Sequence, residues 1–377
     1  MALTITRVEC WVHRAPIDTP LANAFAAMTN RPATWLRISA SDGAWGWGEV
    51  FSNFPTVGAE HRARLIESIF APLLENCVLE APAAMRQMLE ARTRIMAIQC
   101  GEPGPFAQII GAIDQALWDM SARRAGQPLW KHLGGTDPRV RVYASGLGPH
   151  DVVETAATKR AQGFRAFKLK VGFAGSRNRD NLAALREALG TEAIVMVDAN
   201  QAWSPAEAPA RIAELLPYAP HWIEEPIAAD EAAETWQRLA ARTGAPLAAG
   251  ENMRGEDSFT AAINAGYLRF VQPDVGKWGG ITGCGAVGRR AVARGIAFCP
   301  HWLAGGVGLA ASMHLLAAVG GEGFAEVDSN PNPLREEVFP MELADGGVTL
   351  SDAPGLGIEP DLARLRRYVV RSGSSLK

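Results

Sequence analysis

The sequence predicts a parallel α/β barrel joined to a smaller α+β domain, and two observations indicate this fold. From about residue 139, eight short apolar runs alternate with stretches of helical pattern, as in a parallel sheet that closes into a barrel. Earlier in the chain the order differs, because three strand-like runs are followed by long helical stretches. The 377 residues, of which 48% are hydrophobic, supply enough apolar material for both parts.

The first domain is expected over residues 1–135 and begins with its strands. LTITRVECWVH, TWLRISAS and WGWGEVFS have strand character, with a turn predicted in SDGAWGWG. Helices are then expected in AEHRARLIESIFAPLLE, AAMRQMLEART and FAQIIGAIDQALWDMSARRAG. The order of strands before helices indicates an α+β domain.

The barrel is expected over residues 136–344, with one short apolar run for each strand. The eight runs are VRVYAS, AFKLKV, AIVMVDAN, HWIEEP, PLAAGE, FVQPDV, AFCPHW and GFAEVDS. Residues 345–377 follow, and they contain too little apolar material to fold alone. We therefore expect this last segment to pack back on the first domain.

Composition excludes several classes of function. The net charge of −3 gives no electrostatic case for binding nucleic acid or an anionic membrane, and no apolar run reaches the roughly 18 residues of a membrane span. The five cysteines are widely spaced without a CxxC pair, which disfavours a zinc ribbon or a disulfide scaffold. The first residues lack the pattern of a signal peptide, so a cytoplasmic protein is expected.

Polar and ionisable residues end successive barrel strands. The first such residue at each strand end follows the one before it by 23 to 30 residues, about the length of one strand–helix unit. In a parallel barrel such positions lie at the C-terminal mouth, where active sites of this fold are found. The set consists of Lys168 and Lys170, Asp198 and Asn200, Glu224, Glu251, Asp274, His301 and Glu326.

Each member of this set has a structural interpretation when it is taken alone. An aspartate after a strand is a good helix N-cap, and a histidine after an apolar run is more often a hydrogen-bonded core residue than a catalyst. Two lysines on one strand face are more often an exposed sheet surface. These interpretations do not predict the common register of seven consecutive strand ends, so the set as a whole indicates an active site.

Three of these residues suit a hard divalent cation. Asp198, Glu224 and Glu251 would supply carboxylate oxygens from consecutive strands, which is the ligand type of Mg²⁺. Zinc would prefer nitrogen or sulfur ligands. The sequence therefore predicts one Mg²⁺ per subunit.

The other groups are candidates for acid–base chemistry. Asp274 can orient His301 and favour its charged form. The pKa of Lys170 is expected to be lowered by Lys168 and a nearby divalent cation. Lys170 and His301 would then be two bases that approach the metal from different sides of the barrel.

The ordered motifs resemble the enolase superfamily, in particular its mandelate racemase subgroup. The similarity covers nearly the whole chain through TPL, GWGE, IDQALWDMSARRAGQPLWKHLGG, KLK, VDAN, IEEP, GE, QPDVGKWGGIT, PHW and DAPGLGIE. The resemblance implies a modified (β/α)₇β barrel, capped by an N-terminal α+β domain that the C-terminal segment completes.

The resemblance also implies roles for the residues. Asp198, Glu224 and Glu251 would bind Mg²⁺, and Asn200 would make a polar contact near it. The other implied roles are a general base for Lys170, a contact to the substrate carboxylate for Lys168, acid–base catalysis by His301 with Asp274, and a hydrogen bond to the enediolate for Glu326. The muconate-lactonising branch carries a lysine in place of the dyad. Lys277 lies in that region, but QPD and PHW favour the dyad.

The reaction implied by the resemblance is removal of a proton α to a carboxylate. Dehydration of a sugar acid or related hydroxy acid to a 2-keto-3-deoxy acid is the favoured outcome. A racemase, epimerase or cycloisomerase, or a dehydratase of a hydroxy-amino acid, would use the same residues. Specificity is expected from loops 20–30 and 49–58, which contain Phe25 and Phe51, and from Trp278 and Trp302. The first loop has no cationic residue before Arg31, which disfavours diacid sugars.

The sequence leaves two other classes of protein open. A Schiff-base aldolase barrel also places a lysine on a strand, although it has no need of three strand-end carboxylates. A binding barrel without activity is the second, and the full set of acid–base groups argues against it. A homo-oligomer is expected from the resemblance only.

Overall fold

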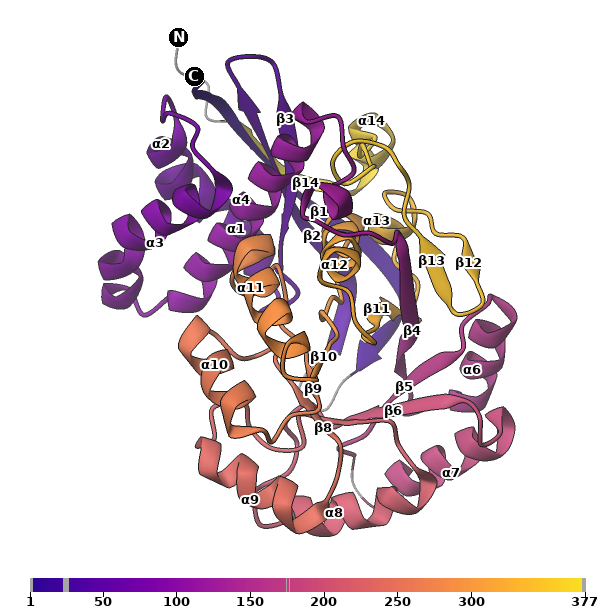
Figure 1. The fold of residues 1–377 in the computed structure, drawn as a ribbon. Coiled ribbons are helices and arrows are strands. Elements are labelled where there is room, and N and C mark those ends of the chain that lie inside the picture. Colours follow the sequence, from indigo (N-terminus) through magenta and orange to yellow (C-terminus); the bar gives the residue numbers. More distant parts are fainter. Residues whose placement is uncertain (1–2, 23–26, 174, 176, 375–377) are drawn as a thin grey trace.

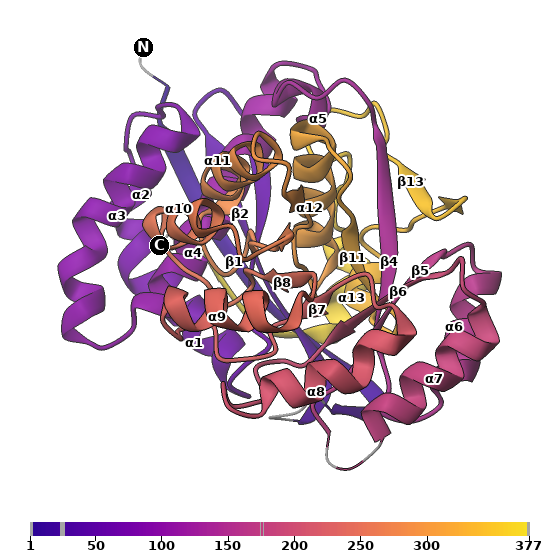
Figure 2. The ribbon, with the colours of Figure 1, turned by 60° about the horizontal axis from the view of Figure 1, so that its bottom comes forward.

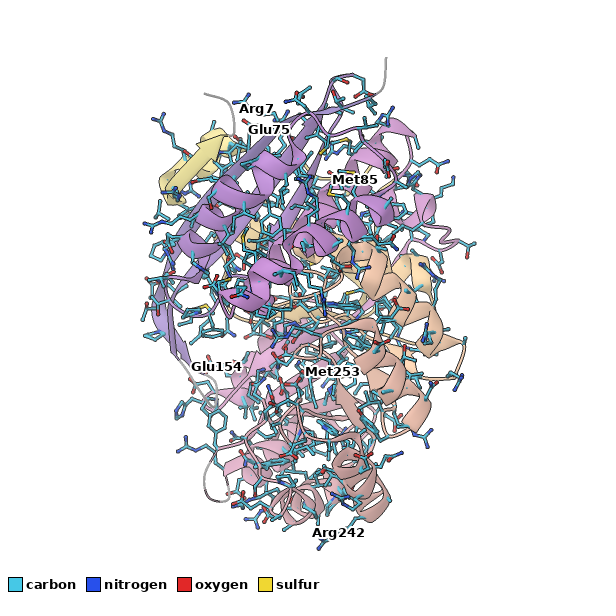
Figure 3. All side chains as sticks on the ribbon, turned by 90° about the vertical axis from the view of Figure 1, so that its left-hand side faces the viewer. Arg7, Glu75, Met85, Glu154, Arg242 and Met253 are labelled. Atoms are coloured by element: carbon cyan, nitrogen blue, oxygen red, sulfur yellow. The ribbon has the colours of Figure 1, made fainter. Side chains whose placement is uncertain are left out.

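The computed structural model describes residues 3–22, 27–173, 175 and 177–374. An antiparallel sheet in the order β14-β1-β2-β3 forms one side of the molecule, and a parallel barrel forms the other (Figure 1). Figure 3 shows Met253 near the border of these two parts and Arg242 at the far end of the barrel. The first sheet consists of β1 Ile5–Ala22, β2 Ala27–Ala40, β3 Trp45–Val50 and β14 Val369–Ser374.

Helices cover one face of this first sheet, and the longest lies directly against β3. Gly46 and Gly48 allow the close approach, because a Cβ atom there would lie 2.0 Å from the Ala116 carbonyl oxygen and 1.9 Å from that of Ala112. These contacts fix β3 on the helix α4. The helices are α1 Gly58–Leu65, a π-helical segment Ile66–Phe70, α2 Ala71–Leu74, α3 Pro82–Gln99, α4 Pro103–Arg124 and α5 Leu129–His132.

Eight parallel strands form the barrel, and they coincide with the eight predicted runs. Each strand from β4 to β9 pairs with the next, and β11 pairs with β4, so the predicted barrel class is confirmed. The strands are β4 Arg139–Leu147, β5 Ala166–Lys170, β6 Ile194–Asp198, β7 Ile223–Glu224, β8 Leu247–Ala249, β9 Phe270–Val271, β10 Ala297–Phe298 and β11 Ala325–Asp328.

One helix follows each of the first seven barrel strands and covers its outer face (Figure 2). Phe167, Leu169 and Val171 point outward into the core between strands and helices, as the period of two predicts. The helices are α6 Val152–Ala161, α7 Arg177–Leu189, α8 Ala208–Leu215, α9 Ala233–Thr243, α10 Glu256–Ala265, α11 Gly280–Val292 and α12 Gly306–Val319; a 3₁₀ segment, Leu216–Tyr218, and α13 Pro333–Glu336 complete this part.

The barrel interior is filled below the lysines of β5. An apolar cluster occupies the lower interior, and Lys168 lies above it with its side chain fully buried. The mouth is therefore closed off from the opposite end of the barrel. The cluster consists of Tyr143, Ala166, Met196, Trp222, Ala248, Cys299 and Phe324.

The last segment contacts both parts of the molecule. The strand β13 Gly347–Thr349 pairs with β4 of the barrel and with β12 Leu343–Ala344. After the short helix α14 Leu362–Leu365 and a 3₁₀ turn over Arg366–Tyr368, β14 pairs with β1. The chain thus returns to the first sheet as expected, but only after it has added a hairpin beside the barrel.

None of the helices in the described residues is long and apolar enough to cross a membrane.

Candidate active site

The parallel register brings three strand ends together at the barrel mouth. Lys170 lies opposite Asp198, and Asp198 lies opposite Glu224, so these side chains project side by side. The Lys170 ammonium donates hydrogen bonds to Asp198 Oδ2 at 2.5 Å and to Asn200 Oδ1 at 2.9 Å. The two lysines that would repel each other on an isolated strand therefore face carboxylates.

Lys168 lies deeper than Lys170. Its ammonium donates to Glu224 Oε1 at 2.6 Å and is 2.8 Å from Glu326 Oε1. Burial alone would lower the pKa of Lys168, but Glu224 and Glu326 outweigh this effect and raise it well above its usual range. Its charge is thus already balanced by protein carboxylates. A direct contact between Lys168 and a substrate carboxylate stays a prediction.

The expected lowering of the Lys170 pKa rests on Lys168 and a divalent cation, and it stays a prediction. Burial acts to lower this pKa, and Lys168 adds a smaller effect in the same direction. The contact with the Asp198 carboxylate outweighs both, so among the protein groups alone the pKa of Lys170 is raised above its ordinary value. The sequence argument counted Lys168 and the cation but not the Asp198 carboxylate on the neighbouring strand.

Asp274 and His301 form the hydrogen-bonded pair that the sequence suggests. His301 Nδ1 lies 2.5 Å from Asp274 Oδ2, and Asp274 Oδ1 accepts the backbone N–H groups of Gly276 and Lys277 at 2.7 and 2.9 Å. The other ring nitrogen of His301 is paired with Glu251. Burial opposes the charged imidazole, but the carboxylates outweigh it and raise the pKa of His301 to about 10.

Lys170 and His301 line one cavity of about 470 Å³. Asn200, Glu251 and Phe51 also line it, the last from the loop after β3. Asn53 and Phe54 line it from loop 49–58, where specificity was expected. Sequence reasoning did not name further lining residues, because they do not end barrel strands; these include Gln108, Asn252 and Arg254.

Two predicted substrate contacts are not at this cavity. The Trp302 ring is buried, and its Nε1–H donates to the Gly305 carbonyl at 2.8 Å. The Trp278 ring packs against Phe259 with 5.4 Å between centroids, beneath the Arg86 guanidinium. The prediction is wrong for these residues because both rings turn into the packing between barrel and first domain. The predicted contact Phe25 lies outside the described residues.

Oxygen donors dominate the mouth, which fits Mg²⁺. Glu225 lies beside the predicted ligands, and its Oε1 is buried without a hydrogen-bond partner. Burial raises the pKa values of Glu224 and Glu225 to about 8, with Asp198 and Glu251 respectively adding to the effect. These observations indicate an excess of buried negative charge that a divalent cation would relieve.

The three predicted ligands are each paired with a cationic side chain in this structure. Asp198 contacts Lys170, Glu224 contacts Lys168, and Glu251 contacts His301. Within the described residues, no three acidic, histidine or cysteine side chains are gathered as a preformed metal site. The donor chemistry fits Mg²⁺, and binding it would require some of these ion pairs to separate.

A second cavity of about 320 Å³ adjoins the first, and Lys170, Phe54 and Leu303 line both. Arg31 and Asp328 also line this second cavity, where their side chains form a buried ion pair. Arg31 is therefore not a free cation.

Fold and site together define a class of enzyme: a capped parallel barrel whose mouth gathers carboxylates between a lysine and a histidine–aspartate pair. Residues 151–364 match the family described as enolase C-terminal domain-like. Residues 5–134 match the N-terminal domain of mandelate racemase / muconate lactonizing enzyme. The chain belongs to this family of the enolase superfamily, which confirms the resemblance.

Two curated relatives carry named activities. The 3,6-anhydro-alpha-L-galactonate cycloisomerase of Streptomyces coelicolor is 33% identical over 97% of this chain and 99% of its own. The D-galactonate dehydratase of Klebsiella pneumoniae is 35% identical over 75% of each chain. Dehydratases and cycloisomerases are thus both found among the relatives.

Solved structures of the family are closely similar. A mandelate racemase/muconate lactonizing enzyme from Bordetella bronchiseptica is 48% identical, covers 98% of this chain and 100% of its own, and has a TM-score of 0.92. A racemase from Streptomyces coelicolor with bound magnesium is 33% identical over 97% of this chain and all of its own, with a TM-score of 0.88. Magnesium is therefore a ligand of this fold in a homologous protein.

Proposed function

We propose that the protein removes the proton α to the carboxylate of a sugar acid or related hydroxy acid and dehydrates it to a 2-keto-3-deoxy acid. The observation that carries the proposal is that Lys170 and His301 line one cavity from strands that are not neighbours. Two acid–base groups on different sides of one bound molecule are what α-proton removal followed by loss of a β-hydroxyl requires.

Asp198, Glu224 and Glu251 would hold the metal, with Asn200 as a polar neighbour. When bound, Mg²⁺ supplies positive charge next to the substrate carboxylate, where negative charge develops as the α-proton leaves. The buried charge excess at Glu224 and Glu225 supports a divalent cation at this place.

The protein side chains carry out the proton transfers. Lys170, once it has given its own proton to solvent through the cavity, accepts the α-proton. His301, held by Asp274, protonates the departing β-hydroxyl from the other side. Glu326 accepts from the Ser145 hydroxyl at 2.5 Å and lies 2.8 Å from Lys168, and both contacts favour its ionised form. Glu326 would therefore have to take up a proton before it could donate a hydrogen bond to the enediolate.

The positions of the cationic side chains favour substrates whose end opposite the reacting carboxylate is uncharged. Arg31 is committed to Asp328, and Lys277 is 3.5 Å from Glu251. Arg254 lines the cavity but is exposed to water, so it would give a second carboxylate only a screened contact. We therefore expect sugar monoacids to be better substrates than diacids.

Cycloisomerisation is the second candidate, because a cycloisomerase is similar along nearly the whole chain. Racemisation or epimerisation uses the same residues when no group leaves. A screen of sugar acids, anhydro-sugar acids, lactones and hydroxy-amino acids for 2-keto acid formation separates dehydration from the other reactions. Running the unreactive compounds in D₂O with NMR detection of α-deuterium reveals proton removal without net dehydration, and no exchange on any compound would contradict the proposal.

The aldolase alternative is disfavoured because a Schiff-base lysine has no need of three strand-end carboxylates. Borohydride trapping in the presence of carbonyl substrates would identify such an enzyme. A cytoplasmic location and a homo-oligomer, both expected from the sequence, stay predictions.

A further inference from the structure

The strand β3 reaches across the border between the two domains to the loop that carries His301. Glu49 is fully buried, and its two carboxylate oxygens accept the backbone N–H groups of Gly305 at 2.7 Å and Gly308 at 2.9 Å. The chain continues to Asn53, whose Nδ2–H donates to the Leu303 carbonyl at 2.7 Å. These three bonds hold the segment that follows His301.

A second set of bonds from the same region holds the loop that carries Asp274. Gln115 on α4 donates from Nε2 to the Val275 carbonyl at 2.9 Å and to the Glu49 carbonyl at 3.1 Å, and its Oε1 accepts the Glu49 N–H at 3.2 Å. The Phe51 N–H donates to the Gly276 carbonyl at 3.2 Å. Gln115 thus links both sets, because it binds the peptide groups of Glu49 and the residue after Asp274.

The regular barrel strands end before the dyad. The ladder between β9 and β10 ends at Val271 and Phe298, three residues before Asp274 and His301, and beyond it the His301 N–H donates to the Pro273 carbonyl at 3.2 Å. Lys170, by contrast, is the last residue of β5 and is paired in register with β6. The dyad loops are therefore held by the first domain as well as by the barrel.

We propose that Glu49 and Gln115 are positioning residues for the Asp274–His301 dyad, so that the first domain contributes to the geometry of one acid–base group and the barrel sets that of the other. This inference rests on the proposed function of His301. Burial raises the pKa of Glu49 to about 7, partly offset by the N–H groups of Gly308 and Gly305.

The test uses Glu49→Gln and Gln115→Met with a matched control. Glu49→Gln keeps one acceptor and turns an amide N–H₂ toward the second backbone N–H. Gln115→Met keeps the length of the side chain without its hydrogen bonds. Asp119→Asn is the control, because Asp119 is also buried and also accepts two backbone N–H groups, from Trp47 at 2.9 Å and Leu356 at 2.7 Å. Its third partner is Arg123, whose Nε–H donates to Asp119 Oδ2 at 3.0 Å, and all three partners lie outside the dyad loops.

The first readout needs no substrate. In the ¹H NMR spectrum of the wild-type protein labelled with ¹⁵N-histidine, the short His301 Nδ1–H···Asp274 bond should give a proton signal downfield of the amides, assigned by its loss in His301→Gln. Glu49→Gln and Gln115→Met should shift or broaden this signal, whereas Asp119→Asn should leave it in place. An unchanged signal in both test variants would overturn the inference.

The second readout compares two rates on one substrate: formation of the 2-keto acid, which needs His301 to protonate the β-hydroxyl, and exchange of the α-proton in D₂O, which needs Lys170. Lys170→Met and His301→Gln assign the two rates. Both test variants should lower 2-keto acid formation at least about tenfold, as loss of outer hydrogen-bond partners does in other sites, while α-proton exchange is unchanged. Equal losses of both rates would show a merely structural role and overturn the inference. Absence of both reactions in the wild type would instead contradict the proposed function, and the NMR signal would still decide the positioning role.

Discussion

The ion pair between Arg31 and Asp328 allows a prediction that does not depend on the substrate. The two side chains are only 2% and 4% exposed, and they join β2 of the first domain to the end of β11 in the barrel. Arg31→Met removes the charge and keeps apolar volume. It leaves the Asp328 carboxylate buried without its main partner, because Arg335 is 4.0 Å away.

Removing one partner of a buried ion pair destabilises a protein by about 3–5 kcal/mol. Asp328 keeps two hydrogen bonds from Asn330, from the backbone N–H at 3.0 Å and from Nδ2 at 2.8 Å. These bonds reduce the loss, so the lower end of the range, about 3 kcal/mol, is expected for Arg31→Met at pH 7.

The pH dependence of this loss has a definite sign. Burial would raise the pKa of Asp328, but Arg31 outweighs it and holds the pKa below its ordinary value. Such a carboxylate contributes stability above its unfolded pKa of about 4, and the contribution is lost as the pH falls through the folded value. The difference between Arg31→Met and wild type should therefore shrink as the pH falls below about 4.

Urea unfolding and calorimetry of both proteins at pH 7 and pH 3.5 measure these effects. Arg139→Met is a suitable control, because Arg139 pairs with Asp137 in full contact with water, and no measurable change is expected there. A loss for Arg31→Met below about 1 kcal/mol at pH 7, the range of exposed pairs, would refute the reasoning. A loss that grows at low pH would refute it as well.

Three further predictions concern the site and the core. Lys170→Met and His301→Gln should each reduce turnover by about two orders of magnitude or more while the circular dichroism spectrum is unchanged, and wild-type turnover in both variants would contradict the two-base mechanism. Removal of divalent cations with EDTA should abolish turnover and Mg²⁺ should restore it; EDTA-insensitive turnover would exclude the metal at Asp198, Glu224 and Glu251. Burial lowers the pKa of His314 to about 4, and its Nδ1 accepts the Trp130 N–H at 3.0 Å. Stability contributed by neutral His314 should be present above about pH 6.5 and be lost as the pH falls toward 4. Urea unfolding of His314→Gln should show a flatter pH dependence than the wild type. An unchanged dependence would show that other groups cause it.

Strand-end residues were accessible from the sequence because their positions follow from local periodicity. A strand that alternates with period two fixes Lys168 and Lys170 on one face, and repeated strand–helix units fix the common edge for Asp198 and Glu224. These arguments need only neighbouring residues and the rule that parallel strands end at one edge. The barrel mouth could therefore be predicted as a candidate site from the sequence alone.

Helix residues of the first domain could not be predicted in this way. Nothing local places Gln108 at a cavity made by the barrel, yet it lines that cavity. The predicted substrate contacts of Trp278 and Trp302 were wrong for the opposite reason. Both residues adjoin site residues in the sequence, but their rings turn into the core. Side-chain direction in a loop depends on the packing around it, which sequence spacing does not contain.

The sequence by itself determined the barrel, the order of its strands and the chemical groups at its mouth, because these depend on contacts between consecutive units of the chain. The tertiary structure decided which charges are already balanced and which parts hold the site. Arg31 meets Asp328 from 297 positions away, and Glu49 meets Gly305 from 256 positions away. Desolvation and the pairing of buried charges depend on such distant contacts.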